Sequence, residues 1–176
     1  MIIVQKGLSI LSILHPKHYV ESIYDLKPEF FQNNGFKGIV LDIDDTLVEH
    51  GDLNIPGHLF DYVKELKEMG LKIAAVSNNK RKRVLPFCKQ LDIPFYCFSA
   101  KPLKRGYKRA IREMDLNPFE VCTIGDQLFT DILGGNRMKI YTILVRPLSG
   151  KKGFTLNIKR HFEKKVLKKY FKNQGI

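Results

Sequence analysis

Four short polar stretches carry the side chains that could do chemistry, and each follows an apolar run. They are Asp42-Ile43-Asp44-Asp45-Thr46, Ser77-Asn78-Asn79, Lys101-Pro102, and Gly125-Asp126 followed by Asp131. The acidic stretches offer carboxylate oxygens without a histidine or cysteine beside them. Such a set suits Mg²⁺, a hard cation that prefers oxygen ligands.

A metal held by carboxylates, together with Lys101 and the Ser77 hydroxyl, could neutralise the spread charge of a phosphoryl group. One carboxylate beside such a metal can act as a nucleophile, and a second can protonate the leaving oxygen and later activate water. A D-x-D-x-T stretch alone is a weak signal, because acidic pairs often form turns. The four stretches together, in this order, favour a catalytic site over a coincidence of turns.

The elements that would position these side chains alternate between strands and helices. Apolar runs predict about five strands, at residues 38–41, 71–76, 94–98, 121–124 and 140–145. Helical spacing predicts helices at residues 56–70, 80–90, 103–114 and 130–136. Strands separated by helices indicate an α/β fold with a parallel sheet, and the polar stretches would meet at the carboxyl ends of the strands.

The four stretches resemble the motifs of the haloacid dehalogenase (HAD) superfamily of phosphatases. The matching segments are D-I-D-D-T, V-S-N-N, A-K-P and I-G-D-Q-L-F-T-D. Residues 19–25, 130–137 and 141–145 are further similar to the YqeG-type subfamily, which includes phosphatidylglycerophosphate phosphatases. The resemblance covers roughly residues 15–150, and it implies a three-layer Rossmann-like fold.

The resemblance also implies a role for each motif residue. Asp42 would be the nucleophile, and Asp44 would be the general acid and base. The residues that would bind Mg²⁺ are Asp42, Asp44 through its backbone carbonyl, Asp126 and Asp131. The residues that would bind the substrate are Thr46, Ser77, Asn78 and Lys101, of which Lys101 is also counted as catalytic.

The spacing of the motifs bears on substrate access. Members of this superfamily often carry a cap domain, inserted either between the first and second motifs or between the second and third. Here Asp42 and Ser77 are 35 positions apart, and Ser77 and Lys101 are 24 positions apart. A helix and a strand use most of each interval, so the sequence predicts a capless, open site that can admit a large phosphorylated molecule.

Length and charge complete the outline. The chain has 176 residues, which suits one domain, with an apolar extension at 1–35, a core at 36–150 and a basic tail at 151–176. Lys and Arg number 30 against 18 Asp and Glu, a net charge of +12, and the tail carries nine of these basic residues. This charge favours polyanionic partners. Three cysteines without C-x-x-C spacing favour a reducing compartment, the cytoplasm.

The two ends of the chain leave alternatives open. In the tail, Phe162, Val166 and Tyr170 form an apolar stripe between lysines, which suits either packing on the core or lying on an anionic membrane. The apolar residues 1–15 contain no signal-peptide cleavage site and could likewise pack on the core or lie in a membrane interface. Neither end is long and apolar enough for a transmembrane helix.

Two classes of function remain open on these grounds. The first is a Mg²⁺-dependent phosphatase, with phosphatidylglycerophosphate at the inner membrane face as its candidate substrate, or with nucleotides or nucleic-acid ends instead. The second is a basic RNA- or ribosome-associated protein that keeps the fold. The complete set of motif residues favours the enzyme, and no RNA-binding motif with stacking aromatic residues is recognisable.

Overall fold

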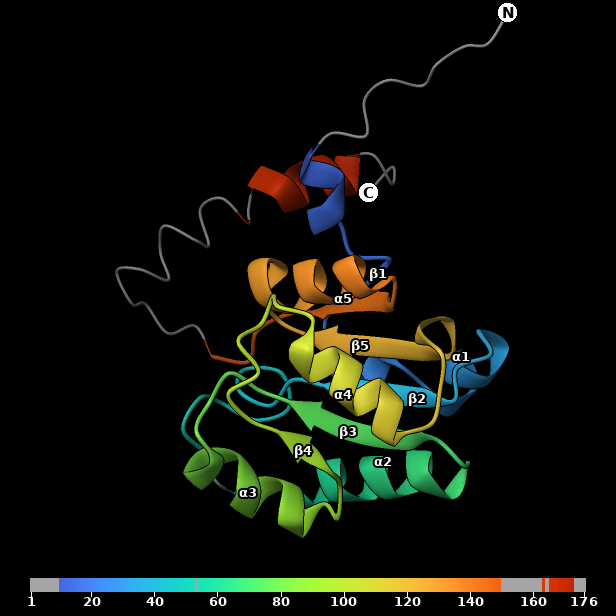
Figure 1. The fold of residues 1–176 in the computed structure, drawn as a ribbon, viewed down its shortest axis with the longest axis vertical. Helices are drawn as coiled ribbons and strands as arrows, with labels where there is room; N and C mark the ends of the chain where they lie inside the picture. The colour runs from blue at the N-terminus through green and yellow to red at the C-terminus, as the bar shows by residue number, and fades with distance from the viewer. Residues whose placement is uncertain (1–9, 53, 150–162, 164, 173–176) are drawn as a thin grey trace, which may run out of the picture.

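The structure is a computed structural model that describes residues 10–52, 54–149, 163 and 165–172. Six strands form one sheet in the order β1-β6-β5-β2-β3-β4, and all neighbouring strands are parallel (Figure 1). The strands are β1 (His18–Val20), β2 (Gly38–Leu41), β3 (Lys72–Val76), β4 (Phe95–Tyr96), β5 (Val121–Gly125) and β6 (Tyr141–Val145). The predicted α/β class with a parallel sheet is confirmed.

The strand count differs from the expected five because of β1. This strand comes from the segment expected to be a helical extension, and it pairs with β6 through His18–Ile143, Tyr19–Leu144 and Val20–Val145. It is only three residues long, and its first two are half-exposed. A run of three residues is too short to show an alternation of apolar and polar side chains. Its extended conformation therefore depends on pairing with a strand more than a hundred residues later in the chain.

Helices cover both faces of the sheet. They are α1 (Pro28–Asn33), α2 (Gly57–Glu68), α3 (Arg81–Gln90), α4 (Arg105–Glu113) and α5 (Leu133–Met138), with short 3-10 turns at Ile10–Leu14, Ile23–Asp25 and Pro118–Glu120 and a π-helical turn at Leu128–Ile132. Side chains of α1, α2 and α3 pack on one face, and α4 packs on the other, together with the π-helical turn. The result is the three-layer arrangement that the sequence predicts.

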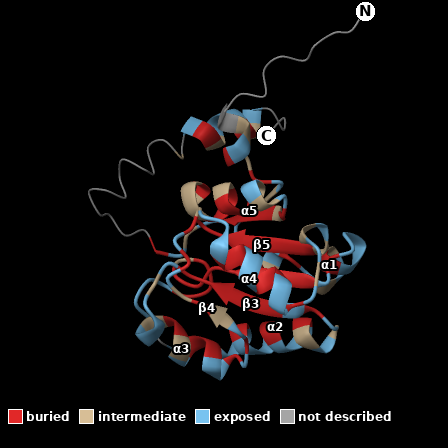
Figure 2. Ribbon diagram, viewed as in Figure 1, coloured by how far each residue is buried: buried red, intermediate tan, exposed pale blue. Residues whose placement is uncertain are grey.

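Apolar spacing explains why these segments form these elements. All four residues of β2 are buried, as expected for a central strand with a layer on each side (Figure 2). The helix α2 buries Leu59, Tyr62, Val63 and Leu66, which lie on one face of a 3.6-residue period. It ends at Glu68 with Met69 as its C-cap, and Gly70 follows with φ +85°, a conformation that favours glycine.

No cap domain interrupts the described part of the chain. Between β2 and β3 the described residues form the helix α2, and between β3 and β4 they form α3. The predicted capless architecture is therefore confirmed. Among the described residues, none of the helices has both the length and the apolar character needed to cross a membrane.

The C-terminal helix packs on the core where it is described. Residues 163 and 165–172 are helical, and Val166 and Tyr170 are buried, beside Leu14 and against His15 respectively (Figure 1). The described part of the apolar stripe, Val166 and Tyr170, therefore packs on the core. The lysines at 165, 168, 169 and 172 are exposed. The predictions for residues 1–9, for the side chains of residues 10 and 11, and for Phe162 concern parts of the chain outside the described residues.

Candidate active site

Two neighbouring strands bring Asp42 and Asp126 to the same edge of the sheet. Strand β2 pairs with β5 so that Leu41 lies beside Ile124, and the Asp42 amide donates to the Ile124 carbonyl at 2.9 Å. Asp42 follows β2 directly, and Asp126 follows β5 directly. The two carboxylates meet because parallel strands end at one edge, which is called the carboxyl edge below.

Asp42, Asp126 and Asp131 form a buried carboxylate cluster. One oxygen from each lies within 4.8 Å of the others, and all three residues are less than 9% exposed. The Thr46 hydroxyl bridges the cluster, 3.3 Å from Oδ2 of Asp42 and 3.4 Å from Oδ1 of Asp126. Three converging carboxylate oxygens at this spacing match the donor set of a divalent oxygen-seeking cation.

The π-helical turn after β5 supplies the third carboxylate. Oδ2 of Asp131 accepts from the Gln127 amide at 3.2 Å and from the Thr130 hydroxyl at 3.3 Å. Gly125 allows this approach, because a Cβ added there would lie 2.4 Å from Cγ of Asp131. Any larger residue at Gly125 would displace the carboxylate from the cluster.

Lys101 is the buried cation of the site. Its Nζ lies 2.6 Å from Oδ1 of Asp42 and 2.6 Å from Oδ1 of Asp131. The side chain of Asn78 holds the lysine loop, because its Oδ1 accepts from the Lys101 amide at 2.6 Å and its Nδ2 donates to the Lys101 carbonyl at 3.2 Å. Asn78 was expected to bind substrate, and the structure places its amide on this backbone.

The electrostatics of the cluster are those of a site prepared for additional positive charge. Burial raises the pKa of Asp42 to about 6, even though Lys101 lowers it. Burial and the nearby Asp42 and Asp131 raise the pKa of Asp126 to about 9. Burial alone would lower the pKa of Lys101, but Asp131 and Asp42 raise it above its ordinary value. A divalent cation would offset this excess of negative charge, so the residues present fit a metal ion.

Asp44 points away from the carboxylate cluster, toward α3. Its Oδ1 accepts from Nη2 of Arg83 at 2.7 Å and from Nε at 3.0 Å, and its Oδ2 accepts from Nδ2 of Asn79 at 2.5 Å. The Gly51 amide also donates to Oδ1 at 3.4 Å, so partners outside the carboxylate cluster hold this carboxyl group. The next residue, Asp45, has φ +64°, and the chain turns sharply there, directly after Asp44.

Arg83 and Asn79 are site residues that were not identified from the sequence. Asn79 stands in the second polar stretch, and Arg83 ends the basic run Lys80-Arg81-Lys82-Arg83 that follows it. The available signal was position, because Arg83 lies one helical turn beyond Asn79 at the start of α3. Which acid it contacts depends on how the loop after β2 folds.

Ser77 lies at the end of β3, the strand next to β2. It is buried, and its hydroxyl accepts from the Asn79 amide at 3.1 Å. The structure thus brings Asp42, Thr46, Ser77 and Lys101 to the same edge as Asp126 and Asp131. Asp42 and Thr46 follow β2, Ser77 follows β3, Lys101 follows β4, and Asp126 and Asp131 follow β5.

A hollow of about 630 Å³ leads away from Asp126 along the ends of β6 and β1. Its apolar lining includes Leu128, Leu144, Leu148 and Leu167. Leu167 belongs to the C-terminal helix, so the tail completes one wall. A group esterified to a phosphate at the carboxylate cluster could extend into this hollow.

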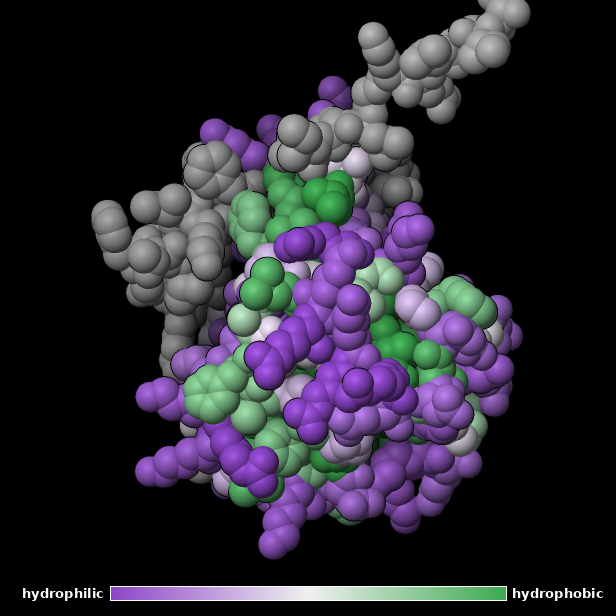
Figure 3. Space-filling view, viewed as in Figure 1, coloured by the Kyte–Doolittle hydropathy of each residue, from purple (hydrophilic) through white to green (hydrophobic). Residues whose placement is uncertain are grey.

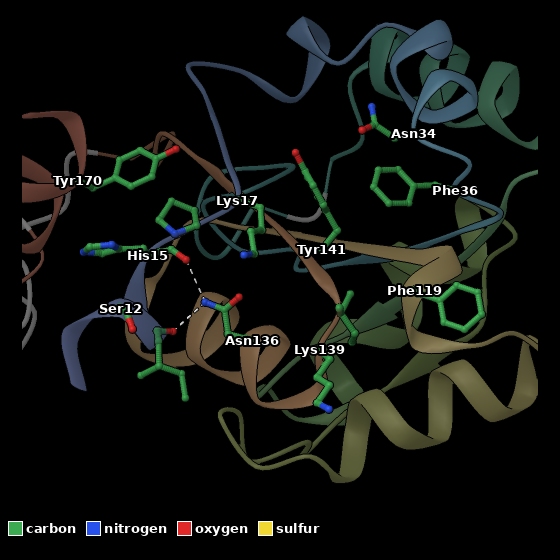
Figure 4. Close-up of a pocket in the computed structure, with 13 residues that line it drawn as sticks. Ser12, His15, Lys17, Asn34, Phe36, Phe119, Asn136, Lys139, Tyr141 and Tyr170 are labelled. Atoms are coloured by element: carbon green, nitrogen blue, oxygen red, sulfur yellow. Dashed lines mark hydrogen bonds between the residues drawn. The ribbon is translucent and has the colours of Figure 1, made fainter. Parts of the chain in front are cut away.

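A second hollow, of about 900 Å³, lies at the opposite edge of the sheet, where the strands begin (Figure 4). Asn136 stands beside it and donates to the carbonyls of Ile13 at 2.7 Å and His15 at 3.0 Å. The described residues that line it include aromatic side chains and two lysines but no carboxylate. The lining of this second hollow therefore has no residue in common with the carboxylate cluster.

Comparison with known proteins decides the family. A model of the haloacid dehalogenase-like hydrolases matches residues 48–139. The probable phosphatase YqeG of Bacillus subtilis (strain 168) is 40% identical over 152 residues, which cover 86% of this chain and 88% of that protein. The chain belongs to the haloacid dehalogenase-like hydrolases. The expected enzyme class, a phosphatase of this superfamily, is confirmed.

Solved structures share the fold of this hydrolase at low sequence identity. An uncharacterized protein from Listeria monocytogenes serotype 4b superposes with a TM-score of 0.53 at 17% identity, over 67% of this chain and 85% of that one. The cobalt-bound deoxy-D-mannose-octulosonate 8-phosphate phosphatase from Haemophilus influenzae gives 0.50 at 15% identity, over 64% and 69%. At these identities the likeness shows the fold alone.

Proposed function

We propose that this hydrolase is a Mg²⁺-dependent phosphomonoesterase that acts through an aspartyl-phosphate on Asp42, with phosphatidylglycerophosphate as its substrate. The observation that carries the proposal is the convergence of Asp42, Asp126 and Asp131 within 4.8 Å, with Lys101 bound to two of them. Asp44 lies nearby but is held separately by Arg83 and Asn79. This arrangement separates a nucleophile from an acid–base group.

The residues that would hold the metal ion are Asp42, Asp126 and Asp131, with the backbone carbonyl of Asp44. A bound Mg²⁺ would offset the charge of the carboxylates and of the phosphoryl oxygens. Lys101 and the Ser77 hydroxyl would contact the other phosphoryl oxygens and hold the phosphorus in line with Asp42.

Two displacements complete the reaction. In the first, an Asp42 oxygen forms a bond to phosphorus while the bond to the leaving oxygen breaks, and Asp44 gives its proton to that oxygen. In the second, the Asp44 carboxylate takes a proton from water as the water oxygen attacks phosphorus. The Asp42–phosphorus bond then breaks, which releases inorganic phosphate and restores both carboxyl groups.

The surroundings of the site support a lipid phosphate as substrate. The site is open, because no cap lies between the motifs in the described chain. The lining of the hollow beside Asp126 includes four leucines, and the charged side chains of Arg146, Glu21 and Glu163 stand among them. A leaving group that is partly polar and partly apolar, such as phosphatidylglycerol, matches such a lining.

We place the enzyme in the cytoplasm, at the inner face of the membrane. The lysines at 165, 168, 169 and 172 form the exposed side of the C-terminal helix. Each basic residue near an anionic surface contributes about 1 kcal/mol to membrane binding. The tail would therefore hold the enzyme near its substrate by charge, while its apolar side stays packed on the core.

The test is hydrolysis of phosphatidylglycerophosphate in mixed micelles by the purified protein, with Mg²⁺ and with EDTA. Activity is expected only with the metal. The variant Asp42→Asn should lose turnover, because an amide is too poor a nucleophile, and wild type but not Asp42→Asn should gain one hydroxylamine-sensitive phosphoryl group when quenched during turnover.

The matched control is Asp52→Asn, which makes the same change at an exposed position in the loop after the first motif. It should keep wild-type activity. An active Asp42→Asn enzyme would contradict the mechanism. Efficient hydrolysis of sugar phosphates or nucleotides together with no hydrolysis of the lipid would contradict the substrate and leave the mechanism standing.

A further inference from the structure

Large apolar side chains are exposed on both sides of the catalytic centre. Phe98 is 61% exposed, Leu103 is 53% exposed, and Leu148 is 47% exposed. Phe98 follows β4, Leu103 precedes α4, and Leu148 follows β6, so all three lie at the carboxyl edge. Together they are called the apolar rim.

The order of the strands places the apolar rim around the active site. Asp42 follows β2, which lies between β5 on one side and β3 on the other. Strand β4 is two positions from β2, and β6 is two positions away on the opposite side. With strands about 4.8 Å apart, Phe98 and Leu148 leave the sheet roughly 10 Å to either side of Asp42.

The backbone ties the rim to the catalytic loops. The Leu148 amide donates to the Asp45 carbonyl at 3.0 Å, and the Phe98 amide donates to the Asn79 carbonyl at 3.1 Å. One of these loops follows Asp44, and the other follows Ser77. An object that contacts the rim would therefore lie directly over the phosphoryl site.

Phe98 is held outward at a conformational cost. Its φ is +49°, a region that a bulky side chain rarely adopts, and Ala100 has φ +51°. An aromatic ring that is largely exposed gains little burial to offset such strain. A contact made outside the protein would supply that burial.

The charge around the apolar rim is mostly positive. Exposed cations stand at the starts of α3 and α4 and after β6: Lys80, Arg81, Lys104, Arg105 and Arg146. Four of them lie at helix N-termini, where the helix dipole disfavours cations. The exposed acids of the neighbouring β2–α2 loop are Glu49 and Asp52, and Glu21 is paired with Arg146 at 3.1 Å. In Figure 3, apolar side chains reach the surface among hydrophilic ones.

We propose that the apolar rim is a docking surface for an anionic phospholipid bilayer. Phe98, Leu103 and Leu148 enter the interface between headgroups and acyl chains, and the surrounding cations bind the headgroups. This inference rests on the proposed lipid substrate, since it explains how the catalytic edge comes to face the membrane. Val166 and Tyr170 of the C-terminal helix do not supply the apolar contact, because they are buried.

The experiment is co-sedimentation of the full chain with phosphatidylcholine vesicles that contain or lack phosphatidylglycerol. Wild type should sediment with the anionic vesicles. The double variant Phe98→Ser/Leu103→Ser and the single variant Leu148→Ser should bind at least about tenfold more weakly, because each lost side chain removes apolar area from the interface. For the double variant, whose residues do not line the hollow beside Asp126, the ratio of hydrolysis in vesicles to hydrolysis of p-nitrophenyl phosphate should fall in parallel.

The matched control is Ile13→Ser/Phe119→Ser. These residues are 39% and 74% exposed, and they lie away from the carboxyl edge. The control should bind vesicles like wild type, and circular dichroism should show that every variant is folded. Because the substituted side chains are exposed, the substitutions remove little packing.

The outcomes separate docking from substrate. Vesicle binding that depends on the rim, without lipid hydrolysis, would contradict the proposed substrate and support the docking surface. Lipid hydrolysis in vesicles with unchanged binding of both rim variants would overturn the docking surface alone. The docking surface would also be overturned if the wild-type protein did not bind anionic vesicles, or if the Ile13→Ser/Phe119→Ser control lost as much vesicle binding as the rim variants. Binding of RNA, but not of vesicles, through the apolar rim would likewise overturn the proposed membrane docking surface.

Discussion

Where the strands begin, the helices α1 to α5 each end at or beside a residue with positive φ. These residues are Gly35, Gly70, Asp92, Asp115 and Lys139. This left-handed conformation is the common way to finish a helix, and it satisfies the last carbonyl groups. Where the strands end, positive φ occurs at Asp45, Gly51, Phe98 and Ala100, and none of them finishes a helix.

The charged side chains also differ between the carboxyl edge and the opposite edge, where the strands begin, which is called the amino edge. At the amino edge, Lys37 lies 2.6 Å from Glu120, and hydrogen bonds from Lys37 and Asn117 lower the pKa of Glu120 to about 2. At the carboxyl edge, burial raises the pKa of Asp126 to about 9. At the amino edge, an exposed ion pair satisfies Glu120. The carboxyl edge keeps an excess of buried negative charge, which a divalent metal ion would offset.

The largest expected contrast is between two lysines. Lys101→Met would leave Asp42 and Asp131 buried without their shared cation, and breaking such a pair costs about 3–5 kcal/mol. Its kcat/KM should fall by about 10³-fold. Lys37→Met at the amino edge removes an exposed ion pair and should change neither quantity appreciably.

Urea unfolding in EDTA and steady-state kinetics with p-nitrophenyl phosphate would measure both lysine variants. A stable and active Lys101→Met enzyme would show that the buried lysine of the carboxyl edge matters no more for stability and activity than the exposed lysine of the amino edge.

Two glycines separate activity from stability. In Gly125→Ala the new Cβ would lie 2.4 Å from Cγ of Asp131, so the carboxylate must move, and activity should fall about 100-fold. In Gly70→Ala nothing lies within 4 Å of the Cβ, but φ is +85°, so stability should fall by about 1–2 kcal/mol with activity intact. Thermal unfolding measures the stability of the two glycine variants, and steady-state kinetics measures their activity. A Gly70→Ala enzyme that is stable but inactive would contradict the expected separation of stability from activity.

Arg83 should affect the protonation step. Arg83→Met removes two hydrogen bonds that hold Asp44. Hydrolysis of an alkyl phosphate, which needs a proton on its leaving oxygen, should slow about tenfold. Hydrolysis of p-nitrophenyl phosphate should slow much less. Lys89→Met, an exposed lysine near the other end of α3, is the control and should affect neither substrate.

The smallest effect concerns pH and metal. The folded-state pKa of Asp126 is raised from 3.8 to about 9, so the folded protein keeps a proton that the unfolded chain releases. Stability of the metal-free protein from this group is therefore present at low pH and lost as pH rises toward about 9. Metal binding displaces that proton, so the rise in Tm on adding Mg²⁺ should be greater near pH 9 than near pH 6.

Calorimetry with Mg²⁺ and with EDTA across this pH range would measure that effect. Asp126→Asn should remove the pH dependence. Glu120→Gln, whose parent carboxylate stabilises the fold above its unfolded pKa and loses that effect as pH falls toward about 2, should leave it unchanged. A metal-induced rise in Tm that does not grow with pH would contradict the assignment of Asp126.

The sequence alone determined the alternation of strands and helices and the edge at which the polar stretches meet. Buried strands such as β2 are continuous apolar runs, and α2 keeps a clear 3.6-residue period, so local patterns suffice for both. Parallel pairing then brings Asp42 and Asp126 to the same edge, because all strands end there. They are neighbours because β2 and β5 are adjacent in the strand order, which the residue pattern does not determine.

Only the tertiary structure decided the rest, because those features depend on partners far away along the chain. Strand β1 exists through its pairing with β6, and Arg83 contacts Asp44 across 39 positions. Whether Val166 is buried and Phe98 exposed depends on what lies against each, and an apolar residue in a sequence does not reveal its neighbour.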